Sequence, residues 1–385
     1  MNAAPPDILV IGGGPAGLAT AIRARQAGLT VTLVDGGRPP IDKACGEGLM
    51  PDGAALLERL GVVLTPDQYR PFRGIRYIED DIVVEGAFPG SPGLGMRRPD
   101  LHRALVSRAG AAGVDLRWEV RVTGIEGEFP SPNVGVATDD GPLRGRWLVA
   151  ADGLHSPLRR AAGLEGPPAR CRRFGLRRHY AVAPWTDHVE VHWSDGVEAY
   201  VSPLGGNQVG VALLFADQPP DFDRLLRRFP ALAGRIAGAP QASRQRGAGP
   251  LEQRTRGVVR GNLALIGDAA GYVDAITGEG LSLAFHDAFA VVDAILRENL
   301  GLYAAAHRRI VRVPVALTRM ALFVERHPRL RRRVMRALAA DPRLFRALLA
   351  VHVRVRPPAP AAAWILPRLA WRLARPLHPV SRPAE

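Results

Sequence analysis

DILVIGGGPAGLATAIRARQAGLTVTLVDGG, residues 7–37, predicts a strand, a tight turn, a helix and a second strand in succession. Residues 8–11 form an uninterrupted apolar run, which is typical of a strand buried in a parallel sheet. Residues 31–34 form the next apolar strand, and Asp35 ends it. This order of elements indicates an α/β domain that opens with two parallel strands joined by a helix.

The glycines of the turn have the G-x-G-x-x-G spacing of dinucleotide-binding segments. Gly12 permits the turn, Gly14 lets a pyrophosphate approach the backbone, and Gly17 lets the helix pack against the strand. Pro15 suits the first helical turn, whose amides face the phosphates. Asp35 is placed to accept hydrogen bonds from an adenosine ribose, which favours FAD or NAD over NADP. The alternative is an ordinary glycine turn in an α/β domain.

The composition is that of a loop-rich globular protein. The chain has 385 residues, 47% of them apolar, and its length favours two or three domains. Its two cysteines, Cys45 and Cys171, give no disulfide framework and suggest a reducing compartment, so we expect a cytoplasmic location. We expect no signal peptide, and no apolar run reaches the roughly 18 residues of a membrane-spanning helix.

The net charge of +14 is concentrated in one segment. Residues 301–385 contain 18 arginines and three acidic residues, whereas the first 300 residues are close to neutral. This distribution argues against a nucleic-acid-binding body and indicates a separate role for the C-terminal segment.

Two later segments of the sequence distinguish an FAD site from an NAD site. RWLVAADGLHSPLRRAAGL, residues 146–164, predicts a strand that ends at Asp152-Gly153. GNLALIGDAAGYVDAITGEGLSLAFHDA, residues 261–288, predicts a strand that ends at Gly267-Asp268 and then a long helix. With the first motif, these segments resemble the dinucleotide fingerprint, the DG motif and the GD motif of class A flavoprotein monooxygenases and their geranylgeranyl reductase relatives. The resemblance covers roughly residues 6–300.

The resemblance implies an α/β fold: a glutathione-reductase-type FAD-binding Rossmann-like domain, an antiparallel-sheet substrate domain and a helical C-terminal region. Period-two patterns between residues 188 and 215 independently predict antiparallel strands. The expected ranges are 1–75, 95–168 and 255–300 for the FAD-binding domain, 76–94 and 169–254 for the substrate domain, and 301–385 for the basic helical region.

The resemblance also implies FAD contacts. Asp268 reaches ribityl hydroxyls, and the amides of residues 278–281 lie near the flavin edge that carries negative charge when reduced. Asp152 supports the flavin or, alternatively, caps the next helix. Arg98 and Val122 match positions beside the FAD and at adenine, with surface exposure and strand packing as alternatives. The expected cofactor-binding residues are Gly12, Gly14, Pro15, Ala16, Gly17, Asp35, Gly36, Lys43, Ala44, Cys45, Arg98, Val122, Asp152, Gly153, Gly267, Asp268, Gly278, Glu279, Gly280 and Leu281, with no metal ligands.

KACGEGLMPDG, residues 43–53, holds the only lysine of the chain. It resembles the C-G-(D/E)-G-L-x-P signature of the geranylgeranyl reductase branch and, less closely, a segment of flavin-dependent halogenases. Gly46 and Gly48 let the backbone pass close to a flat ring, and Lys43 neutralises a phosphate. Cys45 then lines the substrate face as the candidate catalytic residue, a proton donor. The alternatives are a group that shapes a dry pocket and an inert apolar side chain.

The sequence patterns in the middle and at the end of the chain are less specific for a function. The tryptophan-rich motif of the halogenases is missing, and Tyr200, Trp193 and His179 either face the substrate or pack in the core. The tail predicts basic amphipathic helices with tryptophans, a pattern that binds anionic membrane interfaces. The alternative is packing on the flavin domain, which we favour for residues 301–350; from residue 356 on, both stay open.

The leading functional hypothesis is an NADH- or NADPH-dependent FAD monooxygenase, a hydroxylase or epoxidase of a lipophilic or aromatic secondary metabolite. The alternative is a reductase of the geranylgeranyl reductase type that saturates isoprenoid double bonds, and a further alternative is a flavin-dependent halogenase. A scaffold protein stabilised by FAD is the non-enzymatic reading. We expect a small lipophilic substrate, no nucleic acid, a monomer or homodimer, and peripheral membrane contact through the tail.

Overall fold

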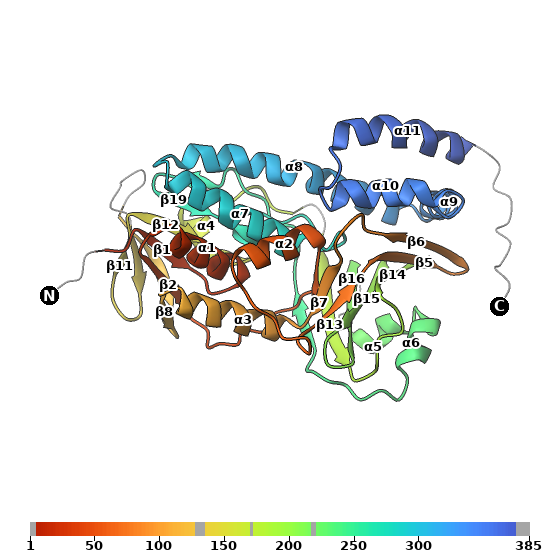
Figure 1. Cartoon of the computed structure of the whole chain (residues 1–385), viewed down its shortest axis with the longest axis horizontal. Helices are drawn as coiled ribbons and strands as arrows, with labels where there is room; N and C mark the ends of the chain where they lie inside the picture. The colour runs from red at the N-terminus through yellow and green to blue at the C-terminus, as the bar shows by residue number, and fades with distance from the viewer. Residues whose placement is uncertain (1–4, 128–134, 170–171, 217–220, 375–385) are drawn as a thin grey trace.

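The computed structural model describes residues 5–127, 135–169, 172–216 and 221–374, so Cys171 and the last part of the tail lie outside the described residues. The chain folds around two sheets arranged along the long axis of the molecule, with helices above both (Figure 1). This arrangement agrees with the α/β fold expected from the sequence. The exact domain boundaries stay a prediction.

The first sheet explains why the three motifs meet. Its order is β18-β19-β12-β1-β2-β8, and all but the edge strand β18 run parallel. Gly12, Asp152 and Gly267 follow three adjacent strands, so they meet at the carboxyl edge of the sheet, where ligands bind in such folds. The strands are β1 (Ile8–Ile11), β2 (Val31–Asp35), β8 (Asp115–Trp118), β12 (Trp147–Ala150), β18 (Val259–Arg260) and β19 (Leu263–Leu265).

Helices and a short hairpin sheet surround these strands. α1 packs against α3 and α7, and apolar side chains of all three join the core of the sheet. The helices are α1 (Pro15–Gln26), α2 (Pro51–Arg59), α3 (Arg98–Ala111), α4 (Pro157–Ala161), the 3-10 helix η1 (Gly267–Ala270) and α7 (Gly280–Ile295). The hairpin sheet contains β9 (Val122–Glu126), β10 (Gly135–Thr138) and β11 (Leu143–Arg144).

The second sheet is mostly antiparallel, as the period-two patterns predict. Its order is β17-β13-β16-β15-β14-β5-β6, and only β5 and β14 pair in parallel. The strands are β5 (Gly74–Glu79), β6 (Ile82–Ala87), β13 (Arg173–Tyr180), β14 (His188–Ser194), β15 (Val197–Leu204), β16 (Gln208–Ala216) and β17 (Arg246–Ala248). A three-stranded sheet of β3 (Gly48–Leu49), β4 (Tyr69–Phe72) and β7 (Gly93–Met96) completes the strands. Two short helices, α5 (Phe222–Leu226) and α6 (Pro230–Ile236), supply apolar side chains to one face of the second sheet.

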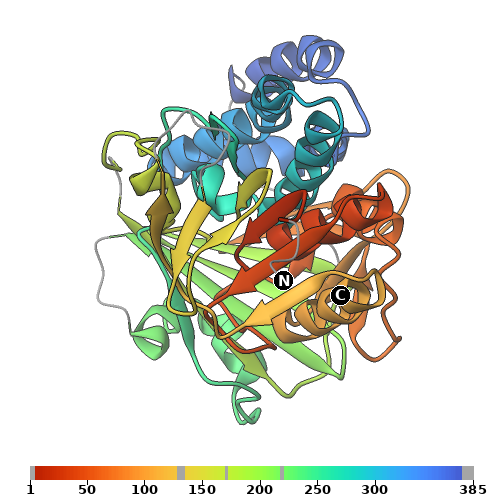
Figure 2. The same cartoon turned by 90° about the vertical axis from the view of Figure 1, so that its left-hand side faces the viewer.

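The C-terminal helices bridge the two sheets. α8 (Leu300–Glu325) packs on α7, whereas α9 (Pro328–Ala339) and α10 (Pro342–His352) pack on β6, and α11 (Pro358–Ala374) lies on α9 and α10. Figures 1 and 2 both show these blue helices gathered on one side of the molecule. The tail therefore covers the antiparallel sheet as well, and not only the flavin domain on which the sequence led us to place residues 301–350.

Pro314 removes one backbone hydrogen bond from α8, and an arginine that follows α10 replaces the missing donor. Proline has no N–H, so the carbonyl of Ile310 lacks its usual helical donor. Arg354 Nη2 donates to that oxygen at 2.9 Å, and its Nε lies 3.3 Å from Asp52 Oδ2. Asp52 belongs to α2 and also binds His286 of α7 at 3.0 Å. One arginine thus joins the tail to the helices beside the parallel sheet.

Arg173 joins three further parts of the fold. Its Nη2 donates to both carboxylate oxygens of Glu198 on β15 at 3.1 Å, and its Nε donates to Asp274 at 2.9 Å. Its Nη1 lies 3.5 Å from Glu325 of α8. All four side chains are buried. Burial, which Arg173 offsets only in part, raises the pKa of Glu198 to about 7.

This raised pKa determines whether the free energy of unfolding rises or falls with pH. Between the ordinary pKa of 4.5 and about 7, folded Glu198 keeps a proton that the unfolded chain releases, so the free energy of unfolding falls as pH rises. Glu198→Gln removes this titration. We expect the slope of unfolding free energy against pH to become less negative by at most about 1.4 kcal/mol per pH unit, measured by calorimetry between pH 5 and 8.

Glu85→Gln on β6 is the matched control, because Glu85 is 45% exposed and belongs to the same sheet. Its pH profile should follow that of the wild type. Identical slopes for Glu198→Gln and the wild type would contradict the expected titration.

Candidate functional site

A cavity of about 850 Å³ lies between the two sheets and extends under the C-terminal helices. One half is lined by residues at the carboxyl edge of the parallel sheet, and we call it the glycine-rich half. The other half is lined by aliphatic and aromatic side chains, and we call it the apolar half. Both halves belong to one continuous space.

Three glycines of the first motif have three different surroundings. A Cβ on Gly12 would lie 2.3 Å from the carbonyl oxygen of Ala151, and its φ is +111°. A Cβ on Gly17 would lie 1.9 Å from the carbonyl oxygen of Gly12. Neither position accepts a side chain, because backbone occupies the space. A Cβ on Gly14 would instead meet only Arg98 Nη2, at 3.8 Å, so this position faces open space in the cavity.

Asp35 is fixed at the end of β2. Its two carboxylate oxygens accept hydrogen bonds from the amides of Gly13 and Gly37, each at 2.7 Å. Trp118 of β8 packs beside Gly13, whose Cβ would lie 2.3 Å from the indole ring. His102 Nε2 lies 2.8 Å from the Gly13 carbonyl oxygen. Neither Trp118 nor His102 belongs to a recognisable motif, so their positions beside Gly13 were not predicted from the sequence.

The glycine-rich half contains charged groups of both signs. Lys43, Arg98 and Asp268 line it. Burial raises the pKa of Asp268, and the nearby cations Arg98, Lys43 and Arg159 oppose this rise. Among the described residues, no donor binds the Asp268 carboxylate, and no acceptor binds the buried Nε of Arg98. Both groups therefore remain available to a ligand in the cavity.

The structure supports the alternative role of Asp152. One carboxylate oxygen accepts a hydrogen bond from Ser156 Oγ at 2.5 Å, and the other accepts one from the amide of Leu158 at 3.1 Å. Ser156 Oγ also accepts a hydrogen bond from the amide of Arg159. Asp152 therefore caps the start of α4, although it still lines the cavity beside Gly153.

The start of α7 also differs in detail from the expectation. The amide of Gly278 donates to the Ala275 carbonyl at 2.9 Å and is therefore engaged. The free amides begin with Gly280, since the first turn of a helix has no intrahelical acceptors. The Glu279 carboxylate does not line the cavity; its Oε2 lies 3.5 Å from Nδ1 of His352 on α10, and both side chains are buried.

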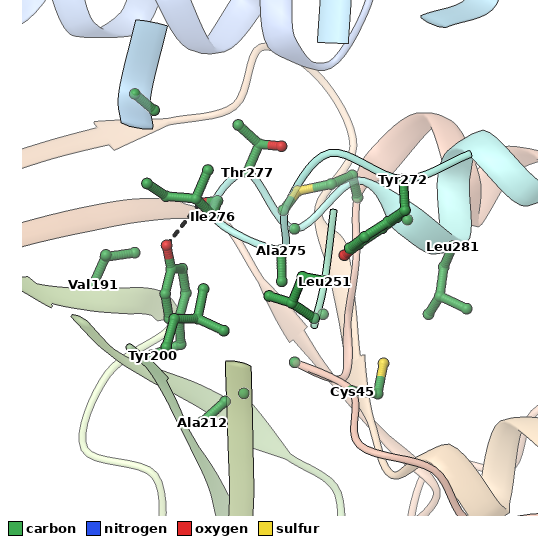
Figure 3. A pocket seen from close by; sticks show the side chains of 18 of the residues that line it. Cys45, Val191, Tyr200, Ala212, Leu251, Tyr272, Ala275, Ile276, Thr277 and Leu281 are labelled. Atoms are coloured by element: carbon green, nitrogen blue, oxygen red, sulfur yellow. Dashed lines mark hydrogen bonds between the residues drawn. The ribbon is translucent and has the colours of Figure 1, made fainter. Parts of the chain in front are cut away.

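Cys45 lies half-buried on the cavity wall, as the sequence led us to expect. Its Sγ accepts a hydrogen bond from the amide of Glu47 at 3.3 Å, and burial raises the pKa of its thiol. Tyr272, which the sequence analysis did not single out, faces the same space (Figure 3). Its hydroxyl has no hydrogen-bond partner among the described residues, and burial raises its pKa well above the usual value. Both groups are therefore protonated at neutral pH.

Glu47 holds the Cys45 segment against the second sheet. It is a buried, non-glycine residue with a φ of +60°. Its Oε1 accepts a hydrogen bond from the amide of Arg98 at 2.8 Å, and its Oε2 binds Nε2 of His179. Nδ1 of His179 lies 2.6 Å from Ser243 Oγ. His179 therefore positions this segment and does not face the substrate, which was one of the two options from the sequence.

The apolar half is built by the antiparallel sheet and the C-terminal helices together. Trp193 and Tyr200 line it, and the Tyr200 hydroxyl donates to the Ile276 carbonyl at 2.7 Å (Figure 3). Burial raises the pKa of nearby Tyr77 to about 12. The other apolar residues that line the apolar half include Val189, Val191, Leu214, Leu251, Leu317, Met320, Val324, Met335, Leu338, Phe345, Leu349, Ile365, Leu366 and Leu369.

The expected cofactor-binding residues thus fall into two groups. Those that line the cavity are Gly14, Pro15, Ala16, Lys43, Ala44, Cys45, Arg98, Asp152, Gly153, Asp268, Gly278, Gly280 and Leu281. Those outside its lining are Gly12, Gly17, Asp35, Gly36, Val122, Gly267 and Glu279. Within the described ranges, no helix is long and apolar enough to cross a bilayer, and no three His, Cys, Asp or Glu side chains form a group suited to a metal ion.

Comparison with curated proteins finds reductases. Menaquinone reductase from Mycolicibacterium smegmatis is 31% identical over 297 residues, which cover 71% of this chain and 72% of that protein. Digeranylgeranylglycerophospholipid reductase 1 from Methanopyrus kandleri is 29% identical over 315 residues, 72% of this chain and 77% of that protein. FAD-dependent monooxygenases also match, at lower identity than the menaquinone reductase.

Comparison with solved structures agrees on the fold. A flavoprotein/dehydrogenase from Cytophaga hutchinsonii superposes with a TM-score of 0.78 at 18% identity, over 91% of this chain and 93% of that chain. Residues 6–301 match the family model described as FAD binding domain. The motifs at the strand ends, the cavity beside them and these matches together place the chain in the FAD-binding domain family, and it is an FAD-dependent oxidoreductase.

Proposed function

We propose that this enzyme reduces carbon–carbon double bonds in the polyprenyl chain of a lipid. The observation that carries the proposal is the continuity of the cavity, which joins the glycine-rich half to a long apolar half. The reductase relatives support it, since menaquinone and digeranylgeranyl lipids both carry isoprenoid chains. The monooxygenase hypothesis favoured by the sequence has weaker support, because its relatives are more distant.

The apolar half suits a branched hydrocarbon. Its lining side chains are almost all aliphatic or aromatic, and the Tyr200 hydroxyl is already bound to the Ile276 carbonyl. A polyprenyl chain offers methyl branches and double bonds but no hydrogen-bonding groups. Its burial is favourable by about 25 cal/mol per Å² of apolar surface, with no polar group to desolvate.

The residues of the glycine-rich half fit an extended FAD. The open space at Gly14 admits a pyrophosphate to the first turn of α1, where Lys43 and Arg98 supply positive charge. The unpartnered Asp268 carboxylate accepts hydrogen bonds from ribityl hydroxyls. The first amides of α7, at Gly280 and Leu281, stabilise negative charge beside the ring. Bound FAD, reduced by NADH or NADPH, supplies the hydride.

The protein then has to supply one proton. Reduction breaks the π bond and forms two C–H bonds, one with the hydride and one with a proton on the neighbouring carbon. In our proposal Cys45 Sγ donates that proton, because burial keeps the thiol protonated at the cavity wall. The thiolate is reprotonated from water. The Tyr272 hydroxyl is the competing donor, since it faces the same space without a partner among the described residues.

A first prediction concerns the cofactor. Gly14→Val is expected to weaken FAD binding by at least tenfold without lowering the melting temperature of the apoprotein. Its Cβ has room in the empty fold, and Gly14 has a φ of −71° that valine adopts easily, but the side chain then occupies the phosphate space. Flavin fluorescence titration measures the affinity. Gly124→Val is the control, because a Cβ there meets nothing within 4 Å and Gly124 lies outside the cavity lining. Undiminished FAD binding by Gly14→Val would contradict the placement.

A second prediction concerns the reaction. Chemically reduced holoenzyme, mixed anaerobically with a menaquinone or with geranylgeraniol in detergent, is expected to reoxidise its flavin and add one H₂ to the isoprenoid chain. Absorbance follows the flavin, and mass spectrometry follows the product. Product formed only with oxygen, and carrying an oxygen atom, would favour the monooxygenase hypothesis and overturn the reductase proposal.

A third prediction assigns the proton donor. Cys45→Ala is expected to slow single-turnover flavin reoxidation by about 10²-fold or more while FAD stays bound, since general acid catalysis contributes at least that much. Tyr272→Phe, which removes only a hydroxyl, is the matched variant and should change the rate less than fivefold. The opposite pattern would transfer the role to Tyr272, and unchanged rates in both variants would exclude a proton donor on this wall.

A further inference from the structure

The cavity opens between α8 and α11. Met320 of α8 and Leu366 of α11 both line the apolar half, yet their exposed fractions are 47% and 61%. A side chain that lines a cavity and also contacts solvent marks the edge of an opening. The apolar half therefore reaches the surface through a mouth with one helix on each side.

Large apolar side chains gather around this mouth. In the described ranges, six of the ten exposed large hydrophobic residues belong to the C-terminal half of α8, to α11 or to the turn that precedes α11. They are Met320, Phe323, Val355, Trp364, Leu366 and Trp371. A group of exposed apolar side chains on the helices beside an opening indicates an interaction surface, whereas single scattered residues need no such explanation.

Arginines accompany these apolar side chains. The guanidinium groups of Arg368 and Arg372 lie 5.0 and 5.2 Å from the ring centroids of Trp364 and Trp371. The exposed Arg319 of α8 and Arg326, which directly follows α8, flank Phe323 and line a second hollow of about 340 Å³, which Glu252 and Asp274 also line. Neither of these two arginines has an ion-pair partner among the described residues.

No carboxylate offsets this charge at the surface of the described tail. Between residues 301 and 374 the only acidic residues are Glu325 and Asp341. Both are buried, Glu325 beside Arg173 and Asp341 beside Arg368 and Arg372. A second copy of the chain would bring like charge against this face, whereas an anionic surface would complement it.

We propose that this face docks on an anionic lipid bilayer and opens the cavity mouth to it. The docking face is Met320, Phe323, Val355, Trp364, Leu366 and Trp371 with Arg319, Arg326, Arg368 and Arg372. Tryptophan at the headgroup level and arginine beside lipid phosphates are the usual composition of interfacial helices. Delivery of a polyprenyl chain through the mouth rests on the proposed function, but docking itself does not.

The face extends the role that the sequence gave to the tail. From the sequence, interface binding stayed open only from residue 356 on, whereas in the structure Met320 of α8 forms one edge of the mouth and Phe323 is exposed on the same helix. Within the described part of the chain, Arg319 and Arg326 have no ion-pair partner, whereas Arg368 and Arg372 share Asp341. Loss of α8 residues should therefore weaken docking as much as loss of α11 residues.

Vesicle sedimentation with the full-length holoenzyme tests the proposal. Wild-type protein should bind vesicles of phosphatidylcholine with one third phosphatidylglycerol, bind pure phosphatidylcholine at least tenfold more weakly, and dissociate in high salt. Trp364→Ser/Trp371→Ser and Arg319→Glu/Arg326→Glu should each lose at least tenfold in binding. Flavin absorbance and melting temperature confirm that each variant remains folded.

Two matched controls lie away from the docking face. Arg224→Glu/Arg227→Glu changes exposed arginines at α5, which lies on the other side of the antiparallel sheet from α11 (Figure 1). Val83→Ser changes a valine of β6 that is 50% exposed. Both should bind anionic vesicles like the wild type, so equal loss in controls and docking-face variants would indicate a general charge effect and overturn the assignment.

Other outcomes separate docking from the proposed function. Trp364→Ser/Trp371→Ser and Arg319→Glu/Arg326→Glu should still reduce a detergent-dispersed substrate, because none of these four residues lines the cavity. Vesicle binding without reduction of any polyprenyl lipid would leave docking intact and refute the proposed function. Failure of the wild type to bind anionic vesicles would overturn docking. A dimer in solution that Trp364→Ser/Trp371→Ser dissociates, without vesicle binding, would assign the face to a second copy.

Discussion

Parallel pairing of β12 between β1 and β19 is the constraint on which the rest of the structure depends. The ladder aligns Ile11 with Ala150 and Ala150 with Leu265, so the chain leaves all three strands at one level. The amide of Ala151 then donates to the Ile11 carbonyl at 2.7 Å, and the amide of Ile266 donates to the Ala150 carbonyl at 3.0 Å. A shift of one residue in either pairing would turn the motif residues to the wrong face of the sheet.

Arginine connects the parts that this sheet does not hold. Arg331 of α9 donates to Glu79 of β5 through Nε and Nη2 and to Asp195 through Nη2, and it is almost fully buried. Arg173 and Arg354 act similarly elsewhere. A guanidinium group offers five donors in a fixed plane, so one side chain can satisfy acceptors from several elements, which an ammonium group does less well. Part of the positive charge of the tail is therefore structural and does not reach the surface.

Local patterns predicted the parts of the site that follow single strands. Apolar runs ending in glycine or aspartate located the edge of the parallel sheet, because strand and turn preferences act within a few residues. The antiparallel sheet of the apolar half was predicted, and Tyr200 and Trp193 line the cavity, but the contribution of α8 to α11 was not predicted, since these helices fold over a sheet built from distant segments. Glu47 and His179 are 132 positions apart in the sequence, so their contact was equally invisible. Tyr272 lay inside a recognised motif, but nothing local shows which way its side chain points.

The cavity has two chemically different ends, and the alkene reduction that we propose uses both. The end of the apolar half between α8 and α11 is lined by apolar side chains, so a proton cannot cross it without a hydrogen-bonding group. The opposite end has such groups, because Glu47 beside Cys45 binds His179, and His179 contacts the partly exposed Ser243. In the proposed reaction, the substrate and the proton therefore reach the Cys45 wall from opposite sides. A reaction that uses one apolar substrate and one proton per turnover fits this separation. The proton does not have to cross the apolar half, and the apolar half does not have to contain water.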